Sequence, residues 1–340
     1  MRLGSSLAAG VPPLPFLGFG GAPIGNLRTA VTDAEATAAI RRAWDRGIRY
    51  FDTAPHYGLG LSERRLGEVL PGLPRTQLVL STKIGRLIVP NPHPADQDDD
   101  GFAVPGDLTR VWDFSLPGAE RSLAESLERL RVDAVDIAFV HDPDQAGPGA
   151  LEEGVRSLAA LKQAGAVRAI GVGTNSTSGL AELIGNGSID VIMLANRYTL
   201  VEHSALETVL DPAARAGVPV IAVGIYGTGL LATARPTPDA SYEHRPADAE
   251  IVRRAHALAE ICESHGVELP AAALAFPMLH PAVAGVVVGM RSAREVDENV
   301  DRAEVDIPAA LWSDLAAEGL IPPGAVRSLE VAEGKASNPR

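Results

Sequence analysis

The amino-acid sequence alternates short apolar runs with longer segments of helical period, and this strand–helix pair occurs eight times. The predicted strands are residues 16–19, 48–52, 78–82, 136–140, 169–173, 191–194, 218–223 and 285–288. The predicted helices are residues 33–46, 62–70, 118–131, 151–164, 177–184, 204–216, 249–265 and 294–301. Strands that alternate with helices run parallel, and the helices cover their sheet. Eight such units predict an α/β fold, a (β/α)8 TIM barrel, with a doubly wound open sheet as the alternative.

Residues at the ends of the predicted helices support this organisation. Thr32 and Asp33 form an N-cap pair before the first helix. Gly47, Gly165 and Gly217 follow helices and stand directly before strands, where a glycine can end a helix in the left-handed conformation. These helix–glycine–strand junctions are the αβ turns that a repeated strand–helix unit needs.

Two connections are much longer than the others. Residues 85–117 and 227–249 are rich in turn-forming residues, including several prolines, and we expect them to be irregular loops. Both follow predicted strands, which places them at the C-terminal face of a barrel, where active sites are built. The tail, 304–340, contains one helical piece near 309–318. We expect residues 1–340 to form a single domain, because no internal linker is evident.

Composition excludes several classes of function. With 30 Lys and Arg against 43 Asp and Glu, the chain carries a formal charge of −13, which disfavours a nucleic-acid partner. We expect no membrane partner, because no apolar run approaches the roughly 20 residues of a membrane helix. Cys262 is the only cysteine, so the chain has no internal disulfide or multi-thiolate zinc site. Residues 1–13 lack the pattern of a signal peptide. We therefore predict a cytoplasmic protein with a small-molecule substrate, whose oligomeric state stays open.

Ionisable residues follow three consecutive predicted strands. Asp52 ends the second strand and Tyr57 follows five residues later, Lys83 follows the third strand, and His141 follows the fourth. An ammonium group lowers the pKa of a nearby phenol, so we expect Lys83 to favour the Tyr57 phenolate. Asp52 could hold the lysine, and His141 could bind a substrate oxygen shared with Tyr57. Such a site transfers a proton for a carbonyl/alcohol pair, with hydride exchanged with a nicotinamide.

A metal-dependent hydrolase is one alternative interpretation of the same strand ends. It would use Asp52, His56, His141 and Asp142 as ligands, but it leaves Tyr57 and the lysine without a role.

Residues 15–299 resemble the aldo-keto reductases, (β/α)8 barrels that bind nicotinamide cofactors without a Rossmann domain. The resemblance is carried by Asp52, Tyr57, Lys83 and His141, in the contexts Phe-Asp-Thr-Ala-Pro-His-Tyr-Gly and Ser-Thr-Lys. It implies that these four residues form the catalytic tetrad. A catalytically inactive regulatory subunit, of the kind this family also supplies to ion channels, is the distant alternative.

Within this family the chain is most similar to the bacterial sugar dehydrogenases that act on D-threo-aldoses, L-fucose and L-galactose. The likeness includes Asp99–Pro105, the segment from Val111 to Ser115 and the run Asn196-Arg197-Tyr198-Thr199-Leu200. It implies oxidation of an aldose at C1 to a lactone, with His56, Trp112 and Asp142 facing the substrate. Pyridoxal 4-dehydrogenase and a general NADPH-dependent aldehyde and ketone reductase are the alternatives.

The resemblance also implies the cofactor residues. Asn196 stands where the family usually has glutamine, and Val223, Gly224 or Tyr226 takes the place of a tyrosine that often stacks on the nicotinamide. Glu295 falls where NADP-selective members often have arginine, which favours NAD slightly over NADP, although Arg291 and Arg294 favour the phosphate. The implied cofactor-binding residues are Gly21, Thr174, Asn175, Asn196, Gly224, Gly289, Arg291, Arg294, Glu295, Glu298 and Asn299.

Overall fold

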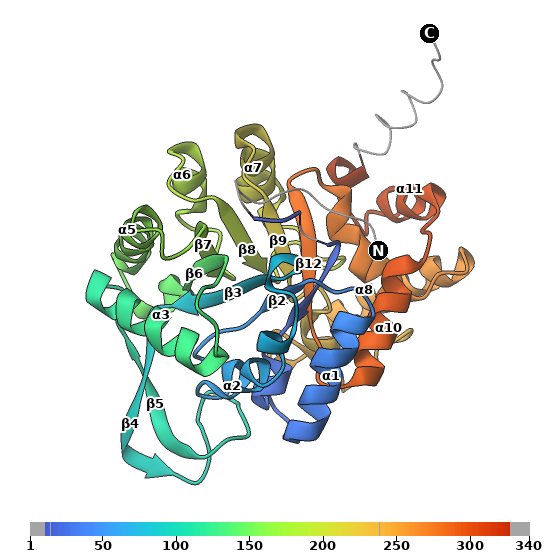
Figure 1. Cartoon of the computed structure of the whole chain (residues 1–340). Coiled ribbons are helices and arrows are strands. Elements are labelled where there is room, and N and C mark those ends of the chain that lie inside the picture. Colours follow the sequence, from blue (N-terminus) through green and yellow to red (C-terminus); the bar gives the residue numbers. More distant parts are fainter. Residues whose placement is uncertain (1–10, 14, 238, 327–340) are drawn as a thin grey trace.

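The structure is a computed structural model that describes residues 11–13, 15–237 and 239–326. Eight parallel strands close into a barrel in the order β1-β12-β9-β8-β7-β6-β3-β2 (Figure 1). They are β1 (Leu17–Gly20), β2 (Tyr50–Asp52), β3 (Val79–Ile84), β6 (Ile137–His141), β7 (Ala169–Thr174), β8 (Val191–Ala195), β9 (Val220–Val223) and β12 (Val283–Gly289). The predicted barrel is confirmed, and each predicted strand boundary lies within two residues of the observed one.

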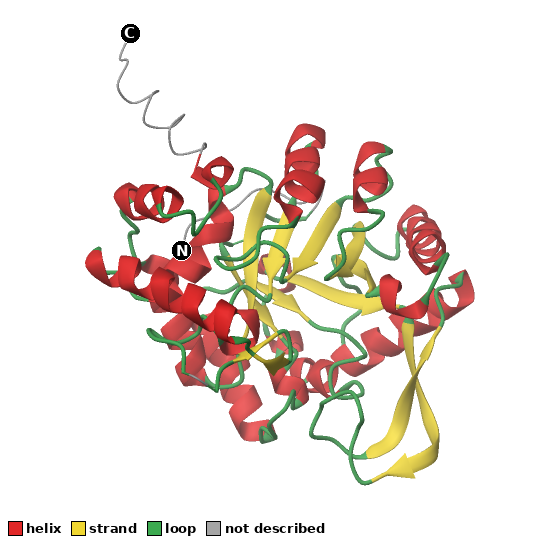
Figure 2. Ribbon diagram, turned by 180° about the vertical axis from the view of Figure 1, so that it is seen from behind, coloured by secondary structure: helices red, strands yellow, loops and turns green. Residues whose placement is uncertain are grey.

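Helices surround the barrel and cover the outer face of its strands (Figure 2). They are α1 (Asp33–Asp45), α2 (Leu61–Gly67), α3 (Leu116–Leu130), α4 (Pro143–Ala146), α5 (Ala150–Gln163), α6 (Leu180–Gly185), α7 (Asp211–Ala216), α8 (Ala249–Ser264), α9 (Leu269–Ala275), α10 (Ala293–Glu304) and α11 (Ala309–Ala317). Thr32 caps α1 as predicted, because its side chain accepts a hydrogen bond from the Glu35 amide at 3.2 Å. The predicted helix over 204–216 instead begins as a π-helical turn, Leu206–Leu210, and α7 starts beside Pro212, which has no amide hydrogen to donate.

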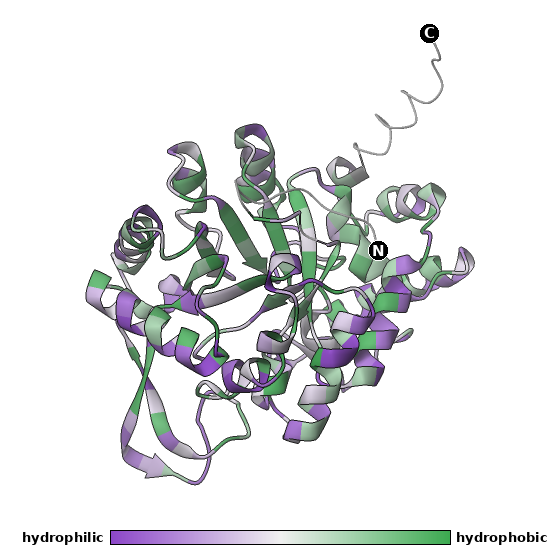
Figure 3. Cartoon of the chain, in the orientation of Figure 1, coloured by the Kyte–Doolittle hydropathy of each residue, from purple (hydrophilic) through white to green (hydrophobic). Residues whose placement is uncertain are grey.

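Side chains of the barrel strands alternate between two apolar layers. Ile137 and Phe139 point into the barrel, whereas Ala138 and Val140 pack outward against the helices. Figure 3 shows the resulting hydrophobic strands inside helices whose outer surfaces are more polar. Because both faces of the sheet are buried, the strand interiors are filled with apolar residues, and polar side chains gather at the strand ends. The barrel therefore holds the ends of neighbouring strands close together.

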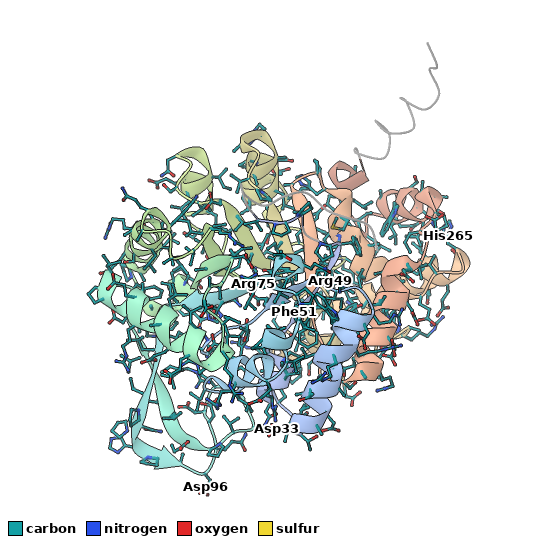
Figure 4. All side chains as sticks on the ribbon, in the orientation of Figure 1. Asp33, Arg49, Phe51, Arg75, Asp96 and His265 are labelled. Carbon is teal, nitrogen blue, oxygen red and sulfur yellow. The ribbon has the colours of Figure 1, made fainter. Side chains whose placement is uncertain are left out.

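The expectation that 85–117 and 227–249 are irregular is wrong. Within the first segment, strands β4 (Arg86–Ala95) and β5 (Gly106–Trp112) form an antiparallel hairpin. Within the second, strands β10 (Ser241–Tyr242) and β11 (Arg245–Pro246) form a short antiparallel hairpin. The β4–β5 hairpin projects from the barrel, and Asp96 lies at its outer end, well away from Phe51 in the barrel wall (Figure 4). Prolines fit here because an isolated two-stranded sheet leaves many backbone amides without a strand partner.

The tail follows α10 along the outside of the barrel. The predicted helical piece is confirmed as α11, which packs against α8. Residues 327–340 of the predicted tail, and most of the predicted N-terminal segment 1–13, lie outside the described residues. In the part of the chain that is described, no helix is both long enough and apolar enough to cross a membrane.

Candidate active site

Strand register brings the four predicted catalytic residues together at one end of the barrel. Asp52 is the last residue of β2 and lies opposite Ser81 of β3, so Lys83, two residues further along β3, points in the same direction. His141 is the last residue of β6, the strand on the other side of β3. Tyr57 stands on the turn between β2 and α2. The structure thus places all four side chains at a single mouth, as the sequence predicts.

Lys83 is the centre of this group. Its Nζ donates to Asp52 Oδ2 at 2.7 Å, to the Thr53 carbonyl at 2.9 Å and to the Tyr57 hydroxyl at 3.1 Å. The three contacts use all three ammonium hydrogens, and the side chain is only 2% exposed. Burial alone would lower the pKa of Lys83, but Asp52 and Tyr57 raise it overall. The lysine is therefore a fixed positive charge beside the phenol.

Asp52 is held in turn by residues beneath it. Ser81 donates its hydroxyl to Asp52 Oδ1 at 2.7 Å, and the Tyr50 hydroxyl lies 2.9 Å from Ser81 Oγ. Both oxygens of the buried carboxylate thus have partners, which offsets the cost of removing its charge from water. The chain of contacts from Tyr50 to Tyr57 leaves little freedom in the lysine position.

The balance of effects on Tyr57 corrects one expectation from the sequence. Burial raises the pKa of Tyr57, and the nearby Lys83 charge opposes this rise without cancelling it. The net pKa is therefore above the ordinary value for tyrosine, whereas the sequence led us to expect it below. The effect of burial is the larger one because the phenol is enclosed by the barrel end and by the segment around Phe102. The ring centroids of Tyr57 and Phe102 are 6.3 Å apart. Near neutral pH the hydroxyl is protonated.

Two imidazole rings flank the phenol. The His141 ring is perpendicular to Tyr57, with centroids 5.7 Å apart, and the His56 ring is 5.5 Å from His141. Burial, with the charges of Lys83 and Arg86, lowers the pKa of His141 well below 6.5. The same kinds of effect lower the pKa of His56 to about 2. Both rings are neutral near neutral pH, so each presents one donor and one acceptor nitrogen.

The β4–β5 hairpin supplies two arginines that the sequence reasoning missed. Arg86 donates to Asp142 Oδ2 at 2.8 Å, and its Nη1 lies 3.3 Å from His56 Nδ1. Arg110 donates to the His56 carbonyl at 3.0 Å and forms an ion pair with buried Asp98. The β-branched and aromatic residues of Leu-Thr-Arg-Val-Trp, residues 108–112, are typical of a strand and could have revealed this element.

Aromatic residues of the same hairpin form a wall of the site. Phe102 is 2% exposed and lies edge-on to His56, with centroids 5.2 Å apart. Trp112, predicted to face the substrate, stacks on Phe114, and the Arg86 guanidinium carbon is 4.3 Å from its ring centroid. The segment also pairs with the turn after β1 through the isolated bridge between Leu27 and Phe102. The insertion therefore reaches over the side of the barrel mouth next to Tyr57.

The positions of the residues argue against the metal-dependent interpretation. Asp52 is engaged by Lys83 and Ser81, while His56 and Asp142 both contact Arg86, a cation that would repel a metal ion. Within residues 11–13, 15–237 and 239–326, no group of three or more His, Cys, Asp and Glu side chains is arranged to hold a metal.

The residues predicted to hold the nicotinamide lie at the ends of β7, β8 and β9. Thr174 donates to Asp144 Oδ1 at 2.7 Å, and the Asn175 carbonyl accepts from Arg197 Nε at 2.7 Å. Asn196 Oδ1 is buried and has no hydrogen-bond partner among the described residues. Any side chain on Gly224 would strike this amide oxygen. An unpartnered acceptor next to an obligatory glycine fits a ligand that brings an amide donor, as the nicotinamide carboxamide would.

Tyr226 and Gly21, implied near the nicotinamide, and Gly289, implied in the adenosine segment, have different surroundings. Tyr226 donates to Asn299 Oδ1 at 2.7 Å and is therefore engaged with α10. Of the three residues expected beside the nicotinamide ring, Val223 and Gly224 are then the remaining candidates. A side chain on Gly21 would strike Ser62 and the backbone of Asp52, so this glycine permits close packing beneath the site. Gly289 is exposed at the end of β12.

The residues predicted to bind the adenosine end cluster at the start of α10. Glu295 accepts from the Arg291 amide at 2.9 Å, and its other oxygen is 3.2 Å from Arg291 Nε. Arg294, on the exposed surface, pairs with Glu298 at 3.1 Å. Asn299 is buried and accepts a hydrogen bond from Tyr226, a contact that joins α10 to the loop after β9. Arg291 and Arg294 are thus each paired with a glutamate of the same segment.

The closed barrel and the Asp–Tyr–Lys–His group identify the class of enzyme: the chain belongs to the aldo/keto reductase family, whose model matches residues 16–317. It is therefore an NAD(P)-dependent oxidoreductase. The chain is 43% identical over 322 residues to D-threo-aldose 1-dehydrogenase from Pseudomonas sp, covering 94% of this chain and 98% of that protein. It is 34% identical to pyridoxal 4-dehydrogenase from Microbacterium luteolum, covering 90% and 94%.

A solved structure shows the same fold. The glycerol dehydrogenase from Gluconobacter oxydans matches with a TM-score of 0.73 and 24% identity, covering 93% of this chain and 96% of that one. At this identity the likeness concerns the barrel alone.

Proposed function

We propose that the protein oxidises a cyclic aldose of the L-fucose, D-arabinose or L-galactose type at C1, producing a lactone. The observation that carries this proposal is the 43% identity to D-threo-aldose 1-dehydrogenase over nearly its whole length. The polar mouth supports it, because His56, Arg86, His141 and Asp142 gather beside Tyr57. Buried polar groups left unpaired cost about 1–3 kcal/mol each, so a polyol that pairs with them binds better than an alkyl alcohol.

In the proposed mechanism Tyr57 exchanges the proton of the C1 hydroxyl. When bound, the nicotinamide cofactor supplies the acceptor for the C1 hydride. Lys83 stabilises the negative charge on the phenol oxygen at 3.1 Å, and Asp52 keeps the lysine charged and in place. His141, neutral and perpendicular to Tyr57, binds the same substrate oxygen. Because the pKa of Tyr57 is raised, the phenolate needed for oxidation is the minor form at neutral pH, and oxidation should quicken as pH rises.

A cyclic sugar is easier to oxidise at C1 than a simple secondary alcohol is at its carbinol carbon. The ring oxygen bonded to C1 stabilises the positive charge that develops there as the hydride leaves. The product is a lactone because C1 keeps its bond to the ring oxygen.

The test is to incubate the protein with L-fucose, D-arabinose and L-galactose and each nicotinamide cofactor. We expect formation of reduced cofactor, seen by its absorbance, and of a lactone two hydrogens lighter than the sugar, seen by mass spectrometry. Oxidation of pyridoxal alone would replace the proposal with the pyridoxal 4-dehydrogenase activity, which the 34% identity favours as the second candidate. Reduction of aldehydes with NADPH alone would indicate a general carbonyl reductase, and cofactor binding without turnover a regulatory subunit.

We also propose a modest preference for NAD over NADP. A 2′-phosphate would place negative charge beside the Glu295 carboxylate, which would repel it. Arg291 already pairs with Glu295 and so offers the phosphate no free positive charge. We expect Glu295→Arg to raise the ratio of kcat/KM for NADP to that for NAD by about tenfold or more. The matched control is Glu304→Arg, which makes the same charge change at the far end of α10. An unmoved ratio in Glu295→Arg would mean that Glu295 does not face the ribose.

The protein's location and partners remain predictions. We expect it to act in the cytoplasm on a small-molecule substrate, without a nucleic-acid partner.

A further inference from the structure

Arg86 contacts three polar side chains at the mouth of the barrel. It begins β4, three positions after Lys83, and its side chain is 7% exposed. One Nη2 group donates to both Asp142 Oδ2 and Gln145 Oε1, at 2.8 and 3.0 Å. The other, Nη1, lies 3.3 Å from His56 Nδ1. A single guanidinium thus joins the loop after β6 to the turn that carries Tyr57.

The chemistry of the pair decides which nitrogen of His56 holds the proton. A guanidinium has five N–H donors and no acceptor, so Arg86 can only donate to Nδ1. Nδ1 must then be the unprotonated nitrogen of the ring. Asp100 could stabilise a proton on Nδ1, but its Oδ2 is 4.0 Å away, beyond hydrogen-bond distance. In a neutral ring the proton therefore sits on Nε2.

The charges around His56 keep the ring neutral. Arg86, Arg110 and Lys83 all disfavour the imidazolium form, and they act in the same direction as burial. The opposing carboxylate, Asp100, is 47% exposed and screened by water. The remaining groups that face the ring are Tyr57, Phe102 and His141. The three cations and burial therefore outweigh Asp100, and His56 does not take a second proton near neutral pH.

The Nε2 atom has no hydrogen-bond partner among the described residues, and the His56 side chain is 14% exposed. We propose that Arg86 is a positioning residue that fixes His56 as the Nε2–H tautomer, so that Nε2 donates a hydrogen bond to a substrate hydroxyl next to the reacting carbon. The substrate part of this inference rests on the proposed function, because it needs a substrate with neighbouring hydroxyls. It separates two binding tasks: Tyr57 and His141 bind the reacting oxygen, and His56 binds the neighbouring one.

Arg110 does not share this role. It donates to the backbone carbonyl of His56 and pairs with Asp98, so it holds the turn without contacting the imidazole nitrogens. Among the arginines that the structure describes, only Arg86 contacts a ring nitrogen of His56.

The first test is the tautomer of His56, read from the 15N shifts of its ring nitrogens by long-range 1H–15N correlation. His56→Asn assigns the signals. We expect wild-type His56 to be protonated at Nε2 and unprotonated at Nδ1. In Arg86→Lys, which keeps a positive charge beside Asp142 but cannot reach both partners, we expect the Nδ1–H form to become populated. Protonation at Nδ1 in the wild type, or an unchanged tautomer in a folded Arg86→Lys and Arg86→Met, would overturn the proposal.

The second test is kinetic. If the hydroxyl contact exists in both ground and transition states, Arg86→Lys should raise KM for the aldose by about 10- to 100-fold and change kcat much less. Among analogues that each lack one hydroxyl, the wild type should discriminate most strongly against one, and the variant should lose that discrimination. Guanidinium ion added to Arg86→Ala should restore part of the lost kcat/KM. Arg121→Met, which removes an exposed arginine from α3, is the matched control and should behave as the wild type.

The two tests separate this inference from the proposed function. The nuclear magnetic resonance experiment needs no substrate, so a correct tautomer without sugar oxidation rejects the proposed function and the assignment of the hydroxyl, but not the arginine–histidine contact. Sugar oxidation with equal discrimination in wild type and Arg86→Lys rejects the positioning role alone.

Discussion

The two sides of the barrel mouth differ in how their polar residues are held. Asp52 and Lys83 sit on barrel strands, and the strand register and buried hydrogen bonds determine their positions. Arg86 and Arg110 come from the β4–β5 hairpin, which is inserted between β3 and α3 and forms a two-stranded sheet of its own. The comparison suggests a division of work. In the proposed mechanism the groups for proton transfer are held by the barrel, and the groups for substrate selection come from the insertion.

The strongest way to test the barrel side is Tyr57→Phe. We expect turnover at saturating aldose to fall by about 10²–10⁴-fold, because only the proton-transfer oxygen is removed. Melting temperature and cofactor binding should stay near the wild-type values. Tyr198→Phe is the matched control, since this buried hydroxyl has no hydrogen-bond partner among the described residues. If Tyr57→Phe kept most of its activity, the assignment of the proton-transfer group would be wrong.

Lys83→Met should damage both stability and chemistry. It leaves Asp52 buried without its charged partner, which we expect to lower the free energy of unfolding by about 3–5 kcal/mol in urea titrations. It also removes the charge that opposes the rise in the pKa of Tyr57, so that pKa should increase further. The alkaline limb of the oxidation rate should then move to higher pH. A stable variant with an unchanged pH profile would show that the lysine does not act on the phenol.

Phe102→Ala tests the hairpin side. The ring packs against His56 and Tyr57, so its loss should loosen the wall of the site. We expect KM for the aldose to rise about tenfold while kcat changes by less than about threefold. Phe276→Ala, a buried ring outside the barrel that contacts Tyr198 and Trp312, controls for loss of stability. A fall in kcat as large as that of Tyr57→Phe would mean that the two sides are not separable.

The smallest expected effect is that neither His141 nor His56 titrates between about pH 7 and about pH 5.5. The pKa values of His141 and His56 are lowered far below 6.5, so both rings stay neutral as the pH falls from about 7 to about 5.5. A group whose pKa is lowered gains its proton only below that lowered value. We therefore expect no histidine inflection in kcat/KM over this range. A decline centred near pH 6.5 would show that one of the two imidazoles is exposed to ordinary titration.

The barrel side was largely predictable from the sequence, whereas the hairpin side was not. Asp52, Lys83 and His141 lie at or next to strand ends, and a barrel brings such ends together whatever the loops do. The sequence predicts an irregular loop here because Pro90 and neighbouring prolines obscure the strand pattern, although Pro90 pairs with Leu108 in the register. The position of Arg86 depends on that hairpin and therefore remained hidden.

Other features depend on three-dimensional packing that no local pattern reveals. The net shift in the pKa of Tyr57 is the balance of burial against the charge of Lys83, and burial is known only from the fold. Likewise, Tyr226 turns toward α10 because Asn299 accepts its hydrogen bond across 73 residues of sequence.

The way the hairpin joins the barrel has a consequence for engineering the site. The Asp113 amide donates to the Gly85 carbonyl at 3.0 Å, so the chain leaves the barrel and returns to it at almost the same point. The twenty-seven residues between these two anchors form an insertion that leaves the pairing of the barrel strands uninterrupted. We expect a hairpin of another sequence, grafted between Gly85 and Asp113 with Arg86 and Arg110 kept, to change substrate selection while β3 keeps its pairing with β2 and β6.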